Sequence, residues 1–145
     1  MDELEALRKL IEEQDYSAAL TLIDEMDEMA KDDKITKVES FLEVLLVHLI
    51  KQRAEQRLTS SWERSIETSL RGITRSNKRR SAGGFYLKSE EIQAALDETF
   101  PYALKEAARE AFGGAFEPKK LLQMFDPQSV KQQALDLILN YDPQN

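Results

Sequence analysis

The stretch from Lys34 to Gln52 constrains the fold more than any other part of this chain. Apolar side chains recur in it at steps of three and four, which is typical of one face of a helix. Between Phe41 and Ile50 almost every position is apolar, so the helix has no side suited to water. Such a helix must be covered all round. We therefore predict an all-α fold, a compact bundle of about six or seven helices around the central buried helix Lys34–Gln52.

Apolar stripes with helical spacing flank this stretch on the N-terminal side, and no segment alternates apolar and polar residues as a strand does. Met1–Glu13 and Tyr16–Ala30 are predicted to pair as an antiparallel helical hairpin. Asp15 is suited to cap the second of these helices, and Asp32-Asp33 is expected to cap the central one. We therefore expect a helix boundary on each side of Tyr16–Ala30.

The second half of the chain carries further helix boundaries. Ser60 is expected to cap a helix whose stripe begins at Trp62, with Glu63 completing a capping box. Ser89 is expected to cap a later helix that continues through Pro101 with a kink, because its apolar stripe is unbroken there. Two shorter helices follow, each opened by an acidic residue and a proline: Glu117-Pro118 and Asp126-Pro127.

Length and composition favour one soluble domain. The 145 residues predict a single domain, 1–145, which is long enough to bury a core without staples. The absence of cysteine excludes disulfides and thiolate metal sites and fits a reducing compartment. The N-terminus is acidic and amphipathic, unlike a signal peptide, and no apolar run approaches the roughly 20 residues that cross a bilayer. We therefore expect a cytoplasmic protein with no membrane partner.

The net charge of −7 is unevenly spread along the chain. Residues 1–33 carry three basic and twelve acidic side chains, whereas residues 51–88 carry ten basic and three acidic ones. A basic segment inside an acidic chain is the strongest feature outside the predicted core. The simplest interpretation is that the basic segment faces the acidic one, within a monomer or across a dimer. A dedicated polyanion site is the alternative.

A positive stripe runs along the segment Arg71–Arg80. Its first cations recur at steps of four and three, and the stripe continues into a loop where two aromatic residues follow. Basic and aromatic side chains together can hold phosphates and stack bases, although cations also stabilise a helix C-terminus without any ligand. The predicted contact residues for a partner or polyanion are Arg71, Arg75, Lys78, Arg79, Arg80, Phe85 and Tyr86.

His48 is the only histidine, so a multi-histidine metal site is excluded. Gln52 and Glu55 lie on its face of the helix, and a carboxylate–histidine pair could act as a general base. The simpler interpretation is a histidine whose ring makes one buried hydrogen bond near the helix end. Glu43 lies five positions before His48, which turns the two side chains about 140° apart and argues against a shared metal ion. We therefore predict no catalytic residue, no metal site and no cofactor.

The run Leu45–Lys51, LLVHLIK, is followed by Ser61-Trp62 and Ser65-Ile66. These pieces, in this order and spacing, resemble the core of a helical family known as domain of unknown function twenty-nine, which is common in cyanobacteria. The resemblance covers about residues 15–112. It makes 16–112 a family-like core and 113–145 a C-terminal helical extension.

The resemblance implies an α-helical domain and no established activity. This chain would be a divergent member, since the segment from Ala82 to Leu87 stands where the family carries a Pro-Ser-Leu motif. His48, Lys51 and Trp62 match recurring positions of the family motif whose role is unknown.

Without a catalytic motif, we expect a non-enzymatic protein-interaction domain that self-associates or binds another protein. The segregated charge and the long central helix favour this hypothesis. The alternative is a nucleic-acid or polyanion binder that uses the Arg71–Arg80 stripe, although nucleic-acid-binding domains are usually basic overall. An enzyme that uses His48 would require an exposed cleft at that residue.

Overall fold

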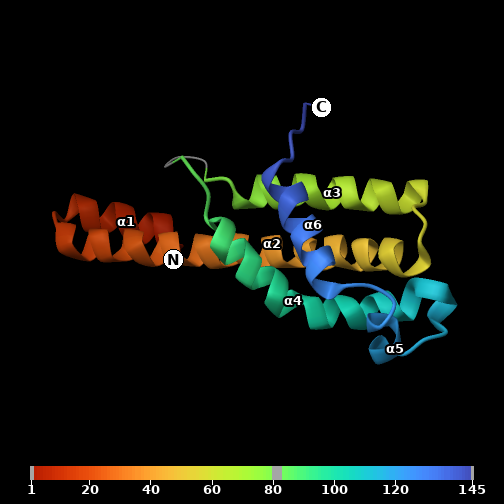
Figure 1. The fold of residues 1–145 in the computed structure, drawn as a ribbon. Coiled ribbons are helices and arrows are strands. Elements are labelled where there is room, and N and C mark those ends of the chain that lie inside the picture. The colour runs from red at the N-terminus through yellow and green to blue at the C-terminus, as the bar shows by residue number, and fades with distance from the viewer. Residues whose placement is uncertain (1, 80–82, 145) are drawn as a thin grey trace. The chain divides into compact units, whose positions relative to one another are not determined.

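The chain folds into helices joined by short connections (Figure 1). The computed structural model describes residues 2–79 and 83–144. Within these residues there are six α-helices, one short 3₁₀ helix and no β-strand, which confirms the predicted all-α fold. The elements are α1 (Glu3–Glu12), α2 (Tyr16–Glu55), α3 (Ser60–Asn77), α4 (Ser89–Glu110), η1 (Ala111–Gly114), α5 (Pro118–Leu122) and α6 (Pro127–Leu139).

Contacts within the chain divide it into two compact units, residues 1–34 and 35–145. The N-terminal unit consists of α1 and the first part of α2, and we call it the hairpin. The second unit holds the rest of α2 and all later helices, and we call it the bundle. No helix in the described part of the chain is long and apolar enough to cross a membrane.

A tight turn closes the hairpin. Asp2 caps α1 by accepting a hydrogen bond from the backbone N–H of Glu5 at 2.9 Å. Gln14 then takes a positive φ of 62°. Asp15 caps α2 as predicted, because its Oδ1 accepts from the N–H of Ala18 at 3.2 Å. The turn reverses the chain, so α1 runs antiparallel to the first part of α2 (Figure 1).

The helix α2 is continuous over 40 residues. The predicted boundary at Asp32-Asp33 is therefore wrong, because these residues lie inside the helix. The segment from Ala30 to Ile35 contains neither glycine nor proline, so nothing in it forces the backbone out of the helical region. An aspartate in a helix interior costs only about 0.7 kcal/mol relative to alanine, which is too little to end a helix alone.

The core of the bundle is built around the C-terminal part of α2, as predicted. Its fully buried side chains are Val38, Leu42, Leu45, Leu46, Leu49 and Ile50. Side chains from the surrounding helices complete the core, among them Ile73 on α3, Leu96 and Phe100 on α4, Leu121 on α5 and Val130 on α6. Val44 is exposed, so the cover around this helix is incomplete on one side.

Gly72 brings α3 close to α2. A Cβ atom built at Gly72 would lie 2.5 Å from the Phe41 ring on α2, which is closer than real Cβ atoms approach any neighbour. The missing side chain at this position therefore lets the Phe41 ring lie directly against the α3 backbone.

Two predicted caps are wrong by one residue. Thr59, rather than Ser60, caps α3 by accepting from the N–H of Trp62 at 3.1 Å. Thr59 and Ser60 are both favoured cap types, so the sequence alone could not separate them. Lys88, rather than Ser89, occupies the cap position of α4, where its N–H donates to Glu91 Oε1 at 3.1 Å.

The helix α4 runs through Pro101 without a break, as its unbroken stripe predicted, and Figure 1 shows it bending along its length. It ends at η1, where Phe112 has a φ of 52° and Gly113 a φ of 66°. The last two helices begin at the predicted prolines, Pro118 and Pro127.

Candidate functional site

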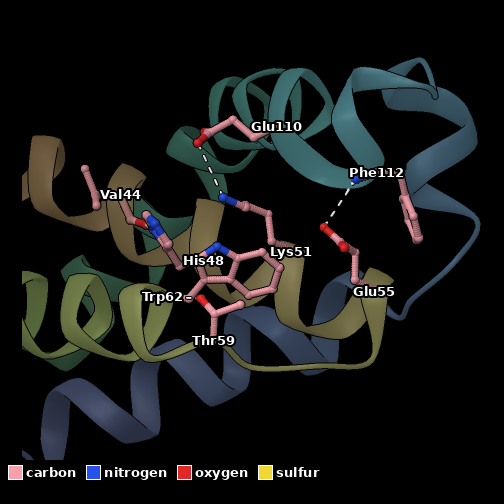
Figure 2. A network of polar contacts seen from close by, with 8 residues as sticks. All are labelled: Val44, His48, Lys51, Glu55, Thr59, Trp62, Glu110 and Phe112. Atoms are coloured by element: carbon pink, nitrogen blue, oxygen red, sulfur yellow. Dashed lines mark hydrogen bonds and ion pairs between the residues drawn. The ribbon is translucent and has the colours of Figure 1, made fainter.

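Lys51 lies where α2, α3 and α4 meet, and only 6% of it is exposed. Its Nζ lies 3.4 Å from Glu110 Oε1 on α4 and 4.7 Å from the centre of the Trp62 ring on α3. Figure 2 shows the ammonium between these two groups. An unpaired buried charge would cost on the order of several kcal/mol, and the carboxylate and the indole face compensate for that cost. One cation therefore ties three helices together.

Neighbouring side chains extend this arrangement. The Arg57 guanidinium lies 4.9 Å from the Trp62 ring centre and donates to Glu55 Oε1 at 3.0 Å. The other oxygen of Glu55 accepts from the N–H of Phe112 at 3.2 Å, which holds the end of α4 and η1 against α2 (Figure 2). We call Lys51, Glu55, Arg57, Trp62 and Glu110 the junction cluster.

The junction cluster has a structural role in our interpretation. In the described residues, no buried side-chain nitrogen or oxygen lacks a hydrogen-bond partner. The charged groups of the junction cluster contact one another, the Trp62 ring or the backbone of Phe112. Lys51 and Trp62, which match the family motif, therefore join helices.

His48 is half-buried, and its Nδ1 donates to the backbone carbonyl of Val44 at 2.8 Å. The single bond agrees with the simpler of the two sequence interpretations, but it is exposed to solvent, whereas that interpretation expected a buried bond. Glu55, the carboxylate considered as its partner, contacts Arg57 and Phe112 instead. Across residues 2–79 and 83–144, no group of three or more histidine, aspartate and glutamate side chains could hold a metal ion.

The members of the predicted positive stripe differ in their exposure and contacts. Arg71, Arg75 and Lys78 are exposed on α3 and just after it. Arg79 is half-buried, with its guanidinium 5.4 Å from the ring centre of Tyr86. The remaining two predicted residues differ, since Phe85 is 59% exposed, whereas Arg80 lies outside the described residues.

Sequence reasoning missed Asn77, which is 5% exposed at the end of α3. Its Nδ2 donates to the carbonyl of Leu87 at 3.0 Å, and its Oδ1 accepts from the N–H of Leu87 at 2.7 Å. The Tyr86 N–H donates to the Asn77 carbonyl at 2.8 Å. Asn77 thus fixes the chain on the far side of the connection between α3 and α4. An asparagine at a helix end was the only available sequence signal.

A cleft of about 720 Å³ in the bundle lies beside α3 and α6 and is lined mainly by polar residues. Arg53 donates from three nitrogens into it, to Gln133 Oε1 at 3.2 and 2.9 Å and to Ser129 Oγ at 2.9 Å. At its edge Tyr141 donates to Glu67 Oε1 at 2.9 Å. Desolvation and then this hydrogen bond raise the pKa of Tyr141 above its ordinary value of 10.0. The polar groups of the cleft are largely engaged with one another.

A smaller pocket of about 200 Å³ lies where α3 ends, α4 begins and α6 ends. Its walls are mainly aliphatic and aromatic, namely Ile73, Phe85, Leu87, Ile92, Ile138 and Leu139. Phe85 and Leu139 are both more than half exposed. We call this site the apolar pocket.

The two helices of the hairpin meet along one contact line. Ala19 on α2 is the one buried residue among residues 2–34, and Leu22 and Met26 near it are half-buried. Leu7 and Leu10 supply the facing side of α1 and are also half-buried. The hairpin therefore has a narrow interior.

A second set of apolar residues in the hairpin is exposed. It comprises Leu4 and Ile11 on α1, and Tyr16, Leu20 and Ile23 on α2. At 3.6 residues per turn, the exposed apolar residues of each helix are rotated roughly a quarter turn about the helix axis from its inward-facing residues. The sense of this rotation is the same in α1 and α2. In an antiparallel pair, equal rotations in the same sense point to the same side. These five side chains therefore form one surface, which we call the outer face.

The model of the family Domain of unknown function DUF29 matches residues 4–128 of this chain. The match includes the hairpin and continues into the start of α6, so it reaches further in both directions than the resemblance over residues 15–112. No curated protein and no solved structure matches the chain at a significant level. Since the family model covers most of the chain, this protein belongs to the family Domain of unknown function DUF29.

Proposed function

We propose that this chain is a protein-interaction domain that self-associates through the outer face of its hairpin. The observation that carries the proposal is the exposure of five large apolar side chains on one side of a unit that buries Ala19 alone among residues 2–34. Contiguous exposed apolar surface of this kind marks interaction sites in proteins.

The size of the hairpin supports the proposal. Units below about 40 residues rarely bury enough surface to be stable without disulfides, metals or association. This chain has no cysteine, and the part that the structure describes contains no group suited to a metal ion. Association would add apolar burial to the hairpin.

The free energies of burial and association indicate what the partner surface must provide. Full burial of one large apolar side chain contributes about 1.5–3 kcal/mol, so five contribute roughly 7–15 kcal/mol at most. Association costs about 4–15 kcal/mol in lost freedom of motion. The outer face alone is therefore close to break-even, and the surface that receives it must also bury apolar groups.

Sedimentation velocity over a concentration series tests the proposal. The wild-type chain should shift from monomer to a larger species as concentration rises. Leu20→Glu, at a position 62% exposed, should keep the helical circular dichroism signal and remain monomeric over the same range. Leu58→Glu is the matched control, since Leu58 is 46% exposed but lies in the bundle, and it should associate like wild type. A wild-type chain that stays monomeric at every concentration contradicts the proposal.

Polyanion binding is a second candidate function, favoured by the exposed cations Arg71, Arg75 and Lys78. Such binding should fall steeply as salt concentration rises, because phosphate contacts release counterions. Charge reversal at Arg71 and Arg75 together should abolish retention on a polyanion column at low salt. Retention of the reversed variant equal to that of wild type would rule this function out.

The proposed interaction involves no catalytic step. His48, the one histidine, hydrogen-bonds within its own helix. The absence of cysteine supports a reducing compartment such as the cytoplasm, and the resemblance to a family common in cyanobacteria favours a source of that kind.

A further inference from the structure

We infer that the outer face of the hairpin docks on the apolar pocket of the bundle in a second copy of the chain. The inference rests on the proposed function, and it names the surface that receives the hairpin. In this contact the hairpin of one copy meets the bundle of another.

The apolar pocket can bury apolar groups of its own when it receives the outer face. Its volume of about 200 Å³ exceeds the roughly 150 Å³ that accommodates a benzene molecule, so it admits one large side chain such as Leu20 or Tyr16. Phe85, 59% exposed, and Leu139, 53% exposed, stand at its mouth and extend the apolar area outward. Both would gain cover from a docked helix.

Charge favours this pairing. Residues 1–33 have nine more acidic than basic side chains, and residues 51–88 have seven more basic than acidic ones. Lys88 lines the pocket, and Lys78 forms a backbone bridge with Phe85 at its mouth. A cationic edge thus borders the pocket, and it complements the acidic hairpin.

Acidic groups near the pocket are largely engaged by the bundle itself. Glu91 accepts from the N–H of Lys88, and Glu67 accepts from Tyr141. They reduce the positive charge around the pocket without reversing the excess of basic side chains in residues 51–88.

Two hairpins facing each other would be a poor alternative. Such a contact would bring two segments of net −9 together, and like charges in an interface oppose association. The larger polar cleft is also a poor receiver, because Arg53, Gln133 and Ser129 already satisfy one another there. An apolar face would leave those groups without water and contribute little in return.

The first test changes the pocket and leaves the hairpin intact. Leu139→Glu places a charge at the mouth of the pocket, at a position exposed enough for the fold to persist. It should weaken self-association at least about thirtyfold, as loss of a central interface residue does. Leu58→Glu again serves as the control, because it precedes α3 and lies about 25 Å from the pocket at 1.5 Å per helical residue.

The second test mixes two defective chains. Leu20→Glu has an altered hairpin and an intact pocket, whereas Leu139→Glu has an intact hairpin and an altered pocket. Each variant should be monomeric alone, and an equimolar mixture should form a 1:1 complex through the one intact pair of surfaces. Raising the salt concentration should weaken the complex, because the charged groups around it are solvent-accessible.

The outcomes separate this inference from the proposed function. If Leu139→Glu associates as well as wild type while Leu20→Glu does not, the hairpin meets another surface, and the inference is wrong while the proposed function stands. If wild type is monomeric, or if Leu20→Glu associates normally, both are wrong. If both variants are monomeric alone and the mixture also stays monomeric, the two surfaces do not meet each other, and the inference fails.

Discussion

The hairpin and the bundle share a helix but differ in what they bury. Leu20 and Leu46 are both leucines in apolar stripes of α2, yet Leu20 is 62% exposed and Leu46 is fully buried. In the bundle, α3, α4, α5 and α6 contribute side chains to the core around α2. Within the hairpin, α1 packs against α2 along a single contact line, which covers one part of a wide stripe. An apolar stripe therefore predicts a helix, whereas the number of surrounding elements decides whether the stripe becomes a core.

The largest expected effect comes from comparing these two leucines. Leu46→Ala should lower the free energy of unfolding by about 2–5 kcal/mol, because it removes apolar contacts and leaves a cavity. Leu20→Ala should change it by at most about 0.5 kcal/mol at concentrations where the chain is monomeric. Urea denaturation followed by circular dichroism measures both. Equal losses for the two variants would mean that the hairpin has a core of its own.

The connection between α3 and α4 and the turn between α1 and α2 extend the comparison between the bundle and the hairpin. Asn77→Ala should cost about 1–3 kcal/mol, because it leaves the N–H and carbonyl of Leu87 without their buried partner. Asp15→Ala, which removes an exposed cap in the hairpin turn, should cost about 1 kcal/mol or less. The same denaturation experiment compares them. A larger loss for Asp15→Ala than for Asn77→Ala would contradict the account.

The contact at Gly72 tests how closely the bundle is packed. Gly72→Ala forces the Phe41 ring to move, which costs about 1–3 kcal/mol, while alanine returns about 1 kcal/mol of helix propensity. We therefore expect a net loss of roughly 1 kcal/mol. In a Phe41→Leu background the loss should shrink or become a gain, and a double-mutant cycle measures this coupling. Additive effects would show that the two residues do not compete for space.

The smallest expected effect concerns the edge of the bundle at Tyr141. Desolvation first, and then the bond to Glu67, raise the pKa of this phenol. Its contribution to stability is therefore fully present below pH 10.0, the ordinary value, and is lost as pH rises through the raised pKa. The ultraviolet titration of wild type minus that of Tyr141→Phe should be centred above pH 10.0. A difference curve centred at or below that value would contradict the bond to Glu67.

Much of the fold could be predicted because its signals are local. The apolar run in α2 identified the central helix, and the acidic residue–proline pairs identified the starts of α5 and α6. The boundary at Asp32-Asp33 was wrong because cap residues permit a helix start without forcing one. The caps Thr59 and Lys88 each lie one residue before the predicted cap, which is the usual uncertainty at helix ends.

The candidate sites were less predictable because they depend on long-range contacts. The family motif drew attention to Lys51 and Trp62, but the partner Glu110 is 59 residues from Lys51 in the sequence. Asn77 carried no pattern that pointed to Leu87. The helical hairpin was predicted, but the exposure of its outer face was not, because burial depends on the elements that surround an apolar stripe.

Amide hydrogen exchange at several protein concentrations tests the central claim most directly. If a second copy covers the hairpin, protection of amides in residues 3–34 should rise with concentration, because association stabilises the bound form. Amides of residues 42–50, in the core of the bundle, should exchange slowly and show much less dependence on concentration. A hairpin that is as well protected in the dilute monomer as in concentrated solution would contradict the claim that it needs a second copy.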